Sequence, residues 1–309
     1  MGLVSVILPT YNRGQYIIDA VKSVLEQTYT DLELIIVDDY SVVPVEETLD
    51  SIDIEVEHKI IRHESNKGQN AARNTGLNEA SGEYLAFIDD DDRWERNKVQ
   101  KQVSTFEDAD KNIGLVYTGY NYISEDGEVV RKVRRTKEGD IMRDYITGKF
   151  DMAPFSAVMI RSEVLEKSGY PDENMPNMTD REWFLRIMRD FRVKSVPDIL
   201  MSRRVDADGR TSQWYNERKN VSVPRFKKKH LPLAIELGCE REFLSFLNYS
   251  IAANAMRVGE YGDARRYAVK SIYYYPWIKD RYIVLFACLG GSLTYNTLRK
   301  AKRIITNIS

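Results

Sequence analysis

The sequence predicts an α/β protein built on a mostly parallel sheet that helices cover on both faces. Strongly apolar, β-branched runs alternate with segments of helical spacing through the first hundred residues, which is the order of a parallel sheet with helical crossovers. The runs end in polar residues, with Pro9 after the first, Asp38 and Asp39 after the second, and Asp89 after the last. Because ligands bind beyond the carboxyl ends of such strands, we expect these clusters to meet at one edge of the sheet.

The first third supplies most of the expected sheet. Its predicted strands are 4–8, 32–37, 55–62 and 84–88, and its predicted helices are 16–26, 46–52 and 70–80. The apolar residues of the helix 16–26 recur at a spacing of three and four, which is the pattern of a helix with one buried side. The helix 70–80 is followed by Ser81 and Gly82, a turn signal that ends it.

The middle third is mixed and the last third is helical. We expect helices at 99–107, 163–167 and 179–189, strands at 114–117 and 156–160, and a turn at 125–128 with strands on either side. From about residue 242 the predicted helices are 243–257, 261–274, 282–289 and 293–305. Small residues at helical spacing around Gly259 resemble a tetratricopeptide-type hairpin, which we interpret as a packing device. Residues 218–229 are polar and basic and are predicted to link the two parts.

Composition excludes several classes of protein. The 309 residues are 43% hydrophobic and 30% charged, with a net charge of −2, which fits a globular protein and argues against a nucleic-acid partner. Cys239 and Cys288 show neither metal-ligand spacing nor a disulfide framework. The N-terminus lacks the basic region and cleavage site of a signal peptide, and the longest apolar window, 282–291, is about half of what a bilayer span needs. We therefore expect a cytoplasmic protein.

The most informative stretch is 84–92, where an apolar strand ends in four consecutive aspartates, Asp89 to Asp92. Adjacent carboxylates repel each other, so a cation among them would lower their energy, and Mg²⁺ typically accepts one or two carboxylates together with phosphate oxygens. Asp89 and Asp91 are alternate residues of an extended segment, so they share a face. The alternative is a solvated acidic turn.

Four motifs in order resemble the family 2 glycosyltransferases. They are 4–8 followed by Pro9-Thr10-Tyr11-Asn12-Arg13, then Val37-Asp38-Asp39-Tyr40-Ser41, then Asn66-Lys67-Gly68 with Ala71-Ala72-Arg73-Asn74, and finally 87–92. The resemblance covers the first hundred residues and extends less tightly to about residue 205. It implies an inverting, nucleotide-sugar-dependent enzyme with the Rossmann-like A-type glycosyltransferase fold. The expected regions are then 1–98 for the nucleotide sugar, 99–217 for the acceptor, and a helical region at 218–309.

The resemblance also implies a donor site, for which a UDP-sugar is favoured. Its residues would be Pro9, Thr10, Tyr11 and Arg13 around the base and ribose, Asp39 on the base, Asn66 and Gly68 before a helix, Arg73 on a phosphate, and Asp89 with Asp90. Asp91 would bind Mn²⁺ or Mg²⁺, and Asp89 would contact the ribose or the metal. Tyr40 departs from the family, which usually has glycine there.

Direct displacement at an anomeric carbon needs a base that takes the proton of the acceptor hydroxyl. The family places this base in a Glu-Asp pair at the start of a helix, and the counterpart here is 178–186. The resemblance assigns the base to Asp180, with Thr179 in place of the glutamate. The alternative for Asp180 is a helix N-cap or first-turn acid, a role compatible with catalysis. Glu182 is the second choice for the base.

Phe155, Ser156 and Trp183 are predicted to line the acceptor pocket, although a core position is an equal alternative for Trp183. The family often has a histidine in a later loop that closes on the diphosphate, and this chain has none there. Its arginines, which are Arg203, Arg204 and Arg210, either contact phosphates or stay solvated. The acceptor is expected to be a glycan or a lipid-linked molecule.

The C-terminal helices allow two interpretations. A basic cluster at 299–303 lies on an amphipathic helix that follows the aromatic run 273–277, so these helices either make peripheral contact with the inner face of the cell membrane or pack against the core. Two other functions stay open for the chain. One is a catalytically silent binding subunit, and the other is a nucleotidyltransferase, which would usually carry a Gly-rich basic loop after the first strand.

Overall fold

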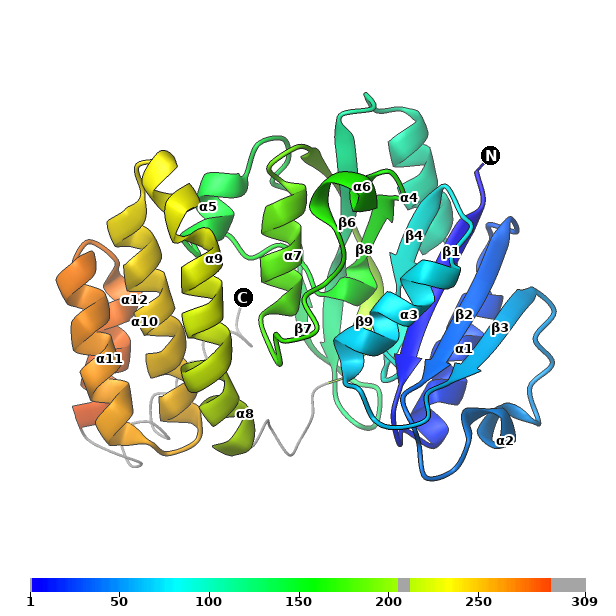
Figure 1. Ribbon diagram of the computed structural model, residues 1–309, viewed down its shortest axis with the longest axis horizontal. Helices are drawn as coiled ribbons and strands as arrows, with labels where there is room; N and C mark the ends of the chain where they lie inside the picture. Colours follow the sequence, from blue (N-terminus) through cyan, green and yellow to red (C-terminus); the bar gives the residue numbers. More distant parts are fainter. Residues whose placement is uncertain (1, 205–211, 290–309) are drawn as a thin grey trace. The chain divides into compact units, whose positions relative to one another are not determined.

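The computed structural model of the chain describes residues 2–204 and 212–289 (Figure 1). The chain divides into two compact units. The first unit consists of Met1–Met142, Asp151–Met175 and Thr179–Gly209, and the second of Arg143–Phe150, Pro176–Met178 and Arg210–Ser309. The expected helix at 293–305 and Arg210 lie outside the described residues. The first unit contains the sheet, and the second is helical.

A mixed sheet forms the centre of the first unit. Its described strands are β1 (Val4–Thr10), β2 (Leu32–Asp38), β3 (Glu57–Arg62), β4 (Tyr84–Phe87), β5 (Asp92–Trp94), β6 (Ile113–Ile123), β7 (Val129–Val133), β8 (Val158–Arg161) and β9 (Arg192–Arg204). They follow the order β3-β2-β1-β4-β8-β6-β9-β5, with β7 paired to β6. The neighbours from β3 to β4 are parallel, as are β6 and β9, whereas β8, β5 and β7 pair antiparallel. The predicted α/β fold class is confirmed.

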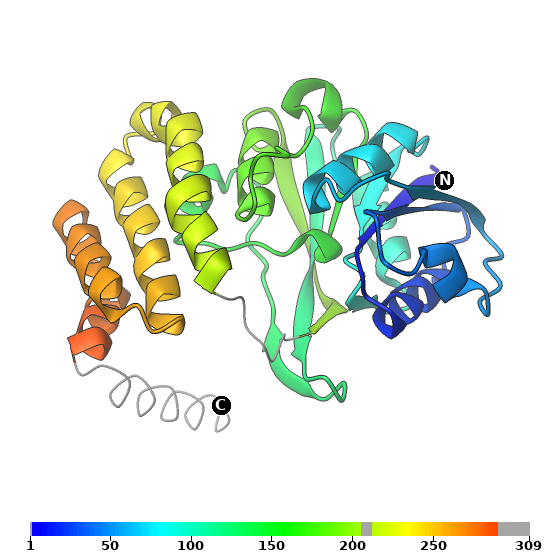
Figure 2. The same cartoon turned by 60° about the horizontal axis from the view of Figure 1, so that its bottom comes forward.

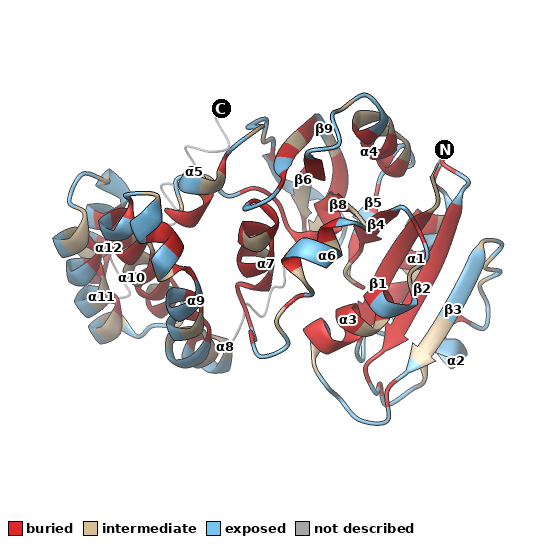
Figure 3. Ribbon diagram, turned by 45° about the horizontal axis from the view of Figure 1, so that its top comes forward, coloured by how far each residue is buried: buried red, intermediate tan, exposed pale blue. Residues whose placement is uncertain are grey.

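Helices cover both faces of the N-terminal half of this sheet. Every residue of β1, β2 and β4 is buried, whereas the edge strand β3 is largely exposed (Figure 3). The chain moves from β1 to β2 on one side of β1 and returns from β3 to β4 on the other. Because parallel crossovers are right-handed, α1 (Gln15–Leu25) and α3 (Gln69–Glu79) lie on opposite faces of the sheet, as Figures 1 and 2 show.

Shorter helices complete the first unit. They are α2 (Val45–Leu49), α4 (Lys98–Glu107), the 3₁₀ turn η1 (Phe155–Ala157), α6 (Val164–Ser168) and α7 (Thr179–Ile187). α4 packs on β6 through Val99, Val103 and Phe106, none of which is accessible to solvent. This spacing of four and three residues is that of an amphipathic helix, and the predicted helix 99–107 is confirmed.

The second unit is a set of helices. They are α5 (Met142–Ile146), α8 (Ser212–Glu217), the π-helix η2 (Arg218–Ser222), α9 (Val223–Glu236), α10 (Glu240–Arg257), α11 (Tyr261–Tyr274) and α12 (Lys279–Leu289). α10 and α11 form the predicted hairpin, with Ala255 and Ala264 fully buried between them and Gly259 in the turn at φ +83°. Among the described helices, none combines the length and the apolar character that crossing a bilayer requires.

The structure corrects the sequence prediction at two places. Residues 218–229, predicted as a linker, are helical in η2 and α9. Val223, Phe226, His230 and Leu233 are buried at a spacing of three, four and three residues. The lysines between them make the segment polar and basic in overall composition and so conceal this pattern. The strands β5 and β9 were not predicted, although β9 lies between β6 and β5 in the sheet. Its apolar residues are interrupted by charged ones and by a proline.

A buried carboxylate joins three segments at the amino edge of the sheet. Glu33 is 2% exposed and accepts hydrogen bonds from the hydroxyl of Ser5 and from the amide and hydroxyl of Ser81 at 2.7 and 2.8 Å. Burial alone would raise the pKa of Glu33, but these hydrogen bonds, together with Lys59, hold it below its usual value. The ionised carboxylate therefore stabilises the fold.

Glu33→Gln should lower the free energy of unfolding at pH 7 by about 1–3 kcal/mol, because all three hydrogen bonds end on Oε1 and a neutral amide oxygen accepts them more weakly than an ionised carboxylate. Since the pKa is lower in the folded protein, this stabilisation is present above the unfolded value of about 4.3 and is lost as the pH falls through the folded value. Urea denaturation at neutral and acidic pH measures both effects. Glu57→Gln on the exposed strand β3 is the control. An equal difference between wild type and Glu33→Gln at both pH values would contradict the assignment.

Candidate functional site

The polar ends of β1, β2 and β4 meet at one edge of the sheet, as predicted. Thr10, the last residue of β1, is in register with Asp38 at the end of β2. Ile7 of β1 is in register with Phe87, the last residue of β4. The loops that follow these strands are therefore neighbours at the carboxyl edge, where α/β sheets bind ligands.

The loops after β1 and β2 are tied to each other. The backbone amide of Asn12 donates to the Ser41 hydroxyl at 2.9 Å, and the side-chain oxygen of Asn12 accepts from the amide of Val42 at 2.7 Å. Asn12 and Tyr40 both have positive φ, at +54° and +72°, a region that is costly for residues other than glycine. Tyr40, which replaces the family's glycine, accepts this conformation with its ring half exposed and the Arg62 guanidinium 5.6 Å from the ring centroid.

Asp39, the residue predicted to bind the base, is 2% exposed and already satisfied within the protein. Its carboxylate accepts from the backbone amides of Lys67 and Gly68 at 2.8 and 2.7 Å and lies 2.8 Å from Nδ1 of His63. Asn66 donates to the Asp39 carbonyl at 3.3 Å. Asp39 thus fixes the loop that leads into α3, and its contact with a base stays a prediction. The contact between His63 and Asp39 was not predicted from the sequence.

Asp38, next to Asp39, shapes the turn after β2. Its side chain is fully buried and accepts from the amides of Ser41 and Val45 and from Arg62. Arg62 also donates to the Ser41 carbonyl at 2.6 Å. The two adjacent aspartates therefore hold different segments in place: Asp38 binds the turn after β2, and Asp39 binds the loop that leads into α3.

The first aspartate of the acidic run is bound by the first turns of α3. Nη2 of Arg73 lies 2.6 Å from Oδ1 of Asp89, and Gln69 donates to the same oxygen at 3.2 Å. Arg73 is only 2% exposed, lies 4.2 Å over the ring of Phe155, and donates to Asn70 at 3.1 Å. It is therefore no surface arginine, and its contact with a phosphate stays a prediction.

The next two aspartates contact the loop after β1. Arg13 pairs with Asp90 at 3.0 Å and with Asp91 at 3.5 Å, and the amide of Tyr11 donates to Asp90 at 3.3 Å. Burial raises the pKa of Asp90 to about 7 against the effect of Arg13, with Asp91 and Asp89 adding to the rise. The aspartates therefore still repel one another in the presence of Arg13.

Asp92 is the buried end of the run. It is 1% exposed and accepts a hydrogen bond of 2.5 Å from Ser156, whose hydroxyl also accepts from the Asp89 amide at 2.9 Å. Burial and the neighbouring carboxylates raise the pKa of Asp92 well above its usual value. Oδ1 of Asp92 is buried without a hydrogen-bond partner among the described residues.

Arg203 of β9, which the sequence left open between a phosphate contact and a solvated position, lies opposite Asp92. The two residues are paired in the β5–β9 register. Burial would lower the pKa of Arg203, but Asp92, Asp89 and Asp180, together with Tyr122, raise it. Arg203 is therefore close enough to the acidic run and to Asp180 for both to act on its charge, a position that only the pairing of β9 could have revealed.

The acidic run fits a hard divalent cation. The side chains of Asp89 and Asp91 are 16% and 18% exposed, so both present carboxylate oxygens to solvent. Burial is the main cause of the raised pKa of Asp90, and the neighbouring carboxylates of Asp91 and Asp89 add to it, so a nearby cation would favour the ionised form of these carboxylates. Within the described part of the chain, no group of three or more His, Cys, Asp or Glu side chains forms a metal site alone. Mg²⁺ usually needs only one or two protein carboxylates together with phosphate oxygens and water, and Asp89 and Asp91 could supply these two.

The start of α7, which carries Asp180, is tied to the start of α3. Nδ2 of Asn70 donates to the hydroxyl of Thr179 at 3.0 Å and to the carbonyls of Met175 and Asp172 at 2.9 and 3.0 Å. Asp180 itself is partly exposed. Glu182, the second choice for the base, is fully buried and accepts from Nε and Nη2 of Arg186 at 2.9 Å, which leaves Asp180 as the more accessible of the two carboxylates.

The three residues predicted to line the acceptor pocket lie in the core. Phe155 is 5% exposed, and Ser156 and Trp183 are not exposed. Trp183 packs against Phe87 and Phe155 at 5.6 and 5.9 Å between ring centroids and donates to the Gly169 carbonyl. Contact of these side chains with an acceptor stays a prediction, and their observed contacts support Arg73 and the acidic run from within the core.

Comparison with known proteins decides the family. Residues 5–169 match the family described as Glycosyl transferase family 2. The chain belongs to this family. This glycosyltransferase is 31% identical over 233 residues to TuaG of Bacillus subtilis, a glycosyltransferase whose name refers to teichuronic acid biosynthesis, covering 72% of the chain and 87% of TuaG. It is 30% identical over 240 residues to the uncharacterized glycosyltransferase YwdF of the same organism, covering 74% and 84%.

Solved structures of low identity share the fold. The glycosyltransferase resembles S. aureus TarS with a TM-score of 0.60 at 17% identity, over 97% of this chain, and it spans 55% of the length of that TarS chain. It resembles the mannosyltransferase PcManGT of Pyrobaculum calidifontis, solved with GDP-Man and Mn²⁺, with a TM-score of 0.56 at 19% identity, over 93% of this chain and 86% of the other. These similarities show the fold.

Asn70→Ala should destabilise this glycosyltransferase by about 1–3 kcal/mol, because it removes the partner of buried polar groups at the start of α7. It should also lower turnover, because Asp180 and Arg73 would lose their common support. Thermal unfolding and a transfer assay measure the two effects. Asn78→Ala, on the exposed last turn of the same helix, is the matched control and should change neither. Wild-type stability and turnover in Asn70→Ala would count against this role.

Proposed function

We propose that this family 2 glycosyltransferase is an inverting enzyme that moves a sugar from a nucleotide-diphosphate donor, a UDP-sugar for preference, to a hydroxyl of a glycan or lipid-linked acceptor. The observation that carries the proposal is that the first two turns of α3 contact both the acidic run and the start of α7. Asn70 there contacts Thr179, the neighbour of Asp180, while Arg73 contacts both Asn70 and Asp89. One rigid segment therefore supports both the acidic run and the start of the helix that carries the proposed base.

The donor would lie at the carboxyl edge of β1, β2 and β4. Pro9, Thr10, Tyr11 and Arg13 would surround the base and ribose, Asp39, Asn66 and Gly68 would close the pocket on the other side, and Arg73, Asp89 and Asp90 would complete it. Tyr11 supports this role because its side chain is 46% exposed at the strand end. TarS has been solved with UDP-GlcNAc and PcManGT with GDP-Man, which supports a nucleotide sugar as the donor class.

The reaction would be a direct displacement. The acceptor oxygen attacks the anomeric carbon from the face opposite the diphosphate, and its proton passes to the carboxylate of Asp180. The bond between the anomeric carbon and the diphosphate oxygen breaks with its electron pair on the diphosphate, so the configuration inverts. Asp91 and Asp89 would hold Mg²⁺ or Mn²⁺, which when bound neutralises charge on the diphosphate. Arg203, close to Asp180 and Asp89, would keep the ionised carboxylates in place.

The competing functions differ in what they predict. Family membership argues against a nucleotidyltransferase, and the loop Pro9-Thr10-Tyr11-Asn12-Arg13 lacks the Gly-rich, basic character that such an enzyme would usually show. A catalytically silent subunit would bind a donor without turning it over.

Hydrolysis of a panel of nucleotide sugars, with and without Mn²⁺, tests the proposal. We expect metal-dependent release of UDP from one or a few UDP-sugars, and no release from any donor would overturn it.

Asp180→Asn should lower the turnover number by at least about a hundredfold, because the amide cannot accept the proton. Donor affinity, measured by calorimetry, should stay near the wild-type value, since Asp180 does not belong to the proposed donor pocket. The control is Asp190→Asn, because Asp190 is exposed and lies just beyond the end of α7. Near-normal turnover in Asp180→Asn would show that another group takes the proton.

Asp91→Ala should weaken donor binding and the response to Mn²⁺ together, because the same carboxylate is proposed to hold the metal that contacts the diphosphate. Calorimetric titration of UDP with and without Mn²⁺ separates the two contributions. Asp53→Ala removes an exposed carboxylate outside the proposed site and should change neither titration. If Asp91→Ala bound UDP with the full Mn²⁺ enhancement, the metal assignment would be wrong.

A further inference from the structure

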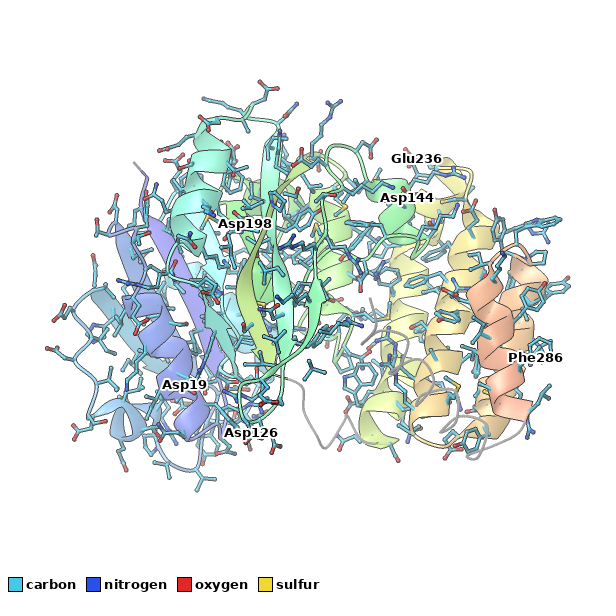
Figure 4. All side chains as sticks on the ribbon, turned by 180° about the vertical axis from the view of Figure 1, so that it is seen from behind. Asp19, Asp126, Asp144, Asp198, Glu236 and Phe286 are labelled. Carbon is cyan, nitrogen blue, oxygen red and sulfur yellow. The ribbon has the colours of Figure 1, made fainter. Side chains whose placement is uncertain are left out.

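The outer faces of α11 and α12 expose large apolar side chains. Trp277 is 81% exposed, Tyr273 76% and Phe286 64%, and Figure 3 shows how much of these two helices is exposed. In Figure 4, Phe286 points away from the ribbon of α12. We define the α11–α12 face by its exposed residues, which are Arg265, Arg266, Val269, Lys270, Tyr273, Trp277, Tyr282, Ile283, Phe286 and Leu289.

The apolar residues of α12 form one continuous stripe. Ile283, Phe286 and Leu289 are 57%, 64% and 60% exposed and recur every three residues, so they fall on one side of the helix. The opposite side is occupied by Val284 and Ala287, which are buried and pack the helix in its unit. Within the described residues, the exposed stripe therefore takes no part in the packing of α12.

The neighbouring helix adds positive charge to these apolar groups. Arg265, Arg266 and Lys270 alternate with Val269 and Tyr273 on the exposed side of α11. This combination of aromatic, aliphatic and basic side chains on one face is that of helices that lie in the interface of a membrane.

Acidic residues are scarce in this part of the chain. From residue 261 to the C-terminus the sequence contains only two, Asp263 and Asp280, while Arg299, Lys300 and further basic residues follow α12. Asp263 is paired with Lys219 and accepts from Tyr215, so its charge is compensated. The chain as a whole has a net charge of −2, and the positive charge is therefore concentrated at this end.

We propose that the α11–α12 face docks on the surface of a bilayer that contains anionic lipids. Trp277 and Phe286 would enter the boundary between headgroups and acyl chains, and Arg265, Arg266 and Lys270 would contact lipid phosphates. A second copy of the chain fits less well, because a two-fold interface sets the same face against itself and would bring these basic residues together. The docking does not depend on the proposed donor chemistry, and it would concentrate the enzyme where a lipid-linked acceptor lies.

Sedimentation with vesicles tests the docking in the full-length protein. Wild type should bind vesicles of phosphatidylcholine mixed with phosphatidylglycerol and should bind pure phosphatidylcholine far more weakly. Trp277→Ser with Phe286→Ser should lower the partition coefficient at least about tenfold, because two large apolar groups leave the interface. Arg265→Gln with Arg266→Gln should lower it by about fivefold per charge, and added salt should weaken the binding of wild type.

Val129→Ser with Val130→Ser is the matched control, since these valines are 51% and 55% exposed on β7 of the first unit. It should bind vesicles as wild type does. Thermal unfolding would verify that all variants fold, and UDP release would verify that the donor site is intact, so that a failure of docking is distinguished from a failure of the proposed function. Two results would overturn the proposal: no difference between the two kinds of vesicle, or a change in self-association of Trp277→Ser with Phe286→Ser, measured by sedimentation velocity, while its lipid binding is unchanged.

Discussion

Four adjacent carboxylates at the end of a buried strand impose the constraint on which the first unit depends. Two unit charges about 5 Å apart repel each other by about 3 kcal/mol at an effective dielectric constant of about 20, so the run is unstable unless cations surround it. Arg13, Arg73 and Arg203 come from a loop, a helix and a distant strand, and each lies close to the run. The charge of the run thus holds together four parts of the first unit, which are the loops after β1 and β4, helix α3 and the long strand β9.

The part of the fold that local pattern determines could be predicted from the sequence. β1, β2 and β4 are short apolar runs with polar ends, and the register confirmed that these ends meet. Strand β9 could not be predicted in this way, because its register partners on β6 lie 78 to 81 residues earlier in the chain and its burial does not follow the regular alternation that indicates a strand. The position of Arg203 beside the acidic run could not be predicted for the same reason. Helix α9 was missed because charged residues outnumber the apolar ones on its surface.

For the site, the sequence predicted which residues gather but not how each is used. Asp39 stands at the predicted edge, yet its oxygens are occupied by amides of a loop whose path the sequence does not reveal. Phe155 and Trp183 belong to motifs that predict a pocket wall, but the structure packs both side chains in the core. Which side of a helix is buried depends on the elements that pack against it, and the local sequence does not show these elements. Arg73 was expected at a phosphate, and its observed partner is Asp89.

The contact of Arg13 with the acidic run has a consequence for how the site responds to ions. Arg13 acts as an internal counter-ion to Asp90 and Asp91, so a divalent cation that approaches Asp91 meets a carboxylate that is already partly neutralised. A cation at Asp91 would therefore compete with the Arg13 guanidinium for that carboxylate. Because Arg13 already offsets part of the charge of the run, the attraction for a cation would be weaker, and less dependent on ionic strength, than four carboxylates alone would suggest.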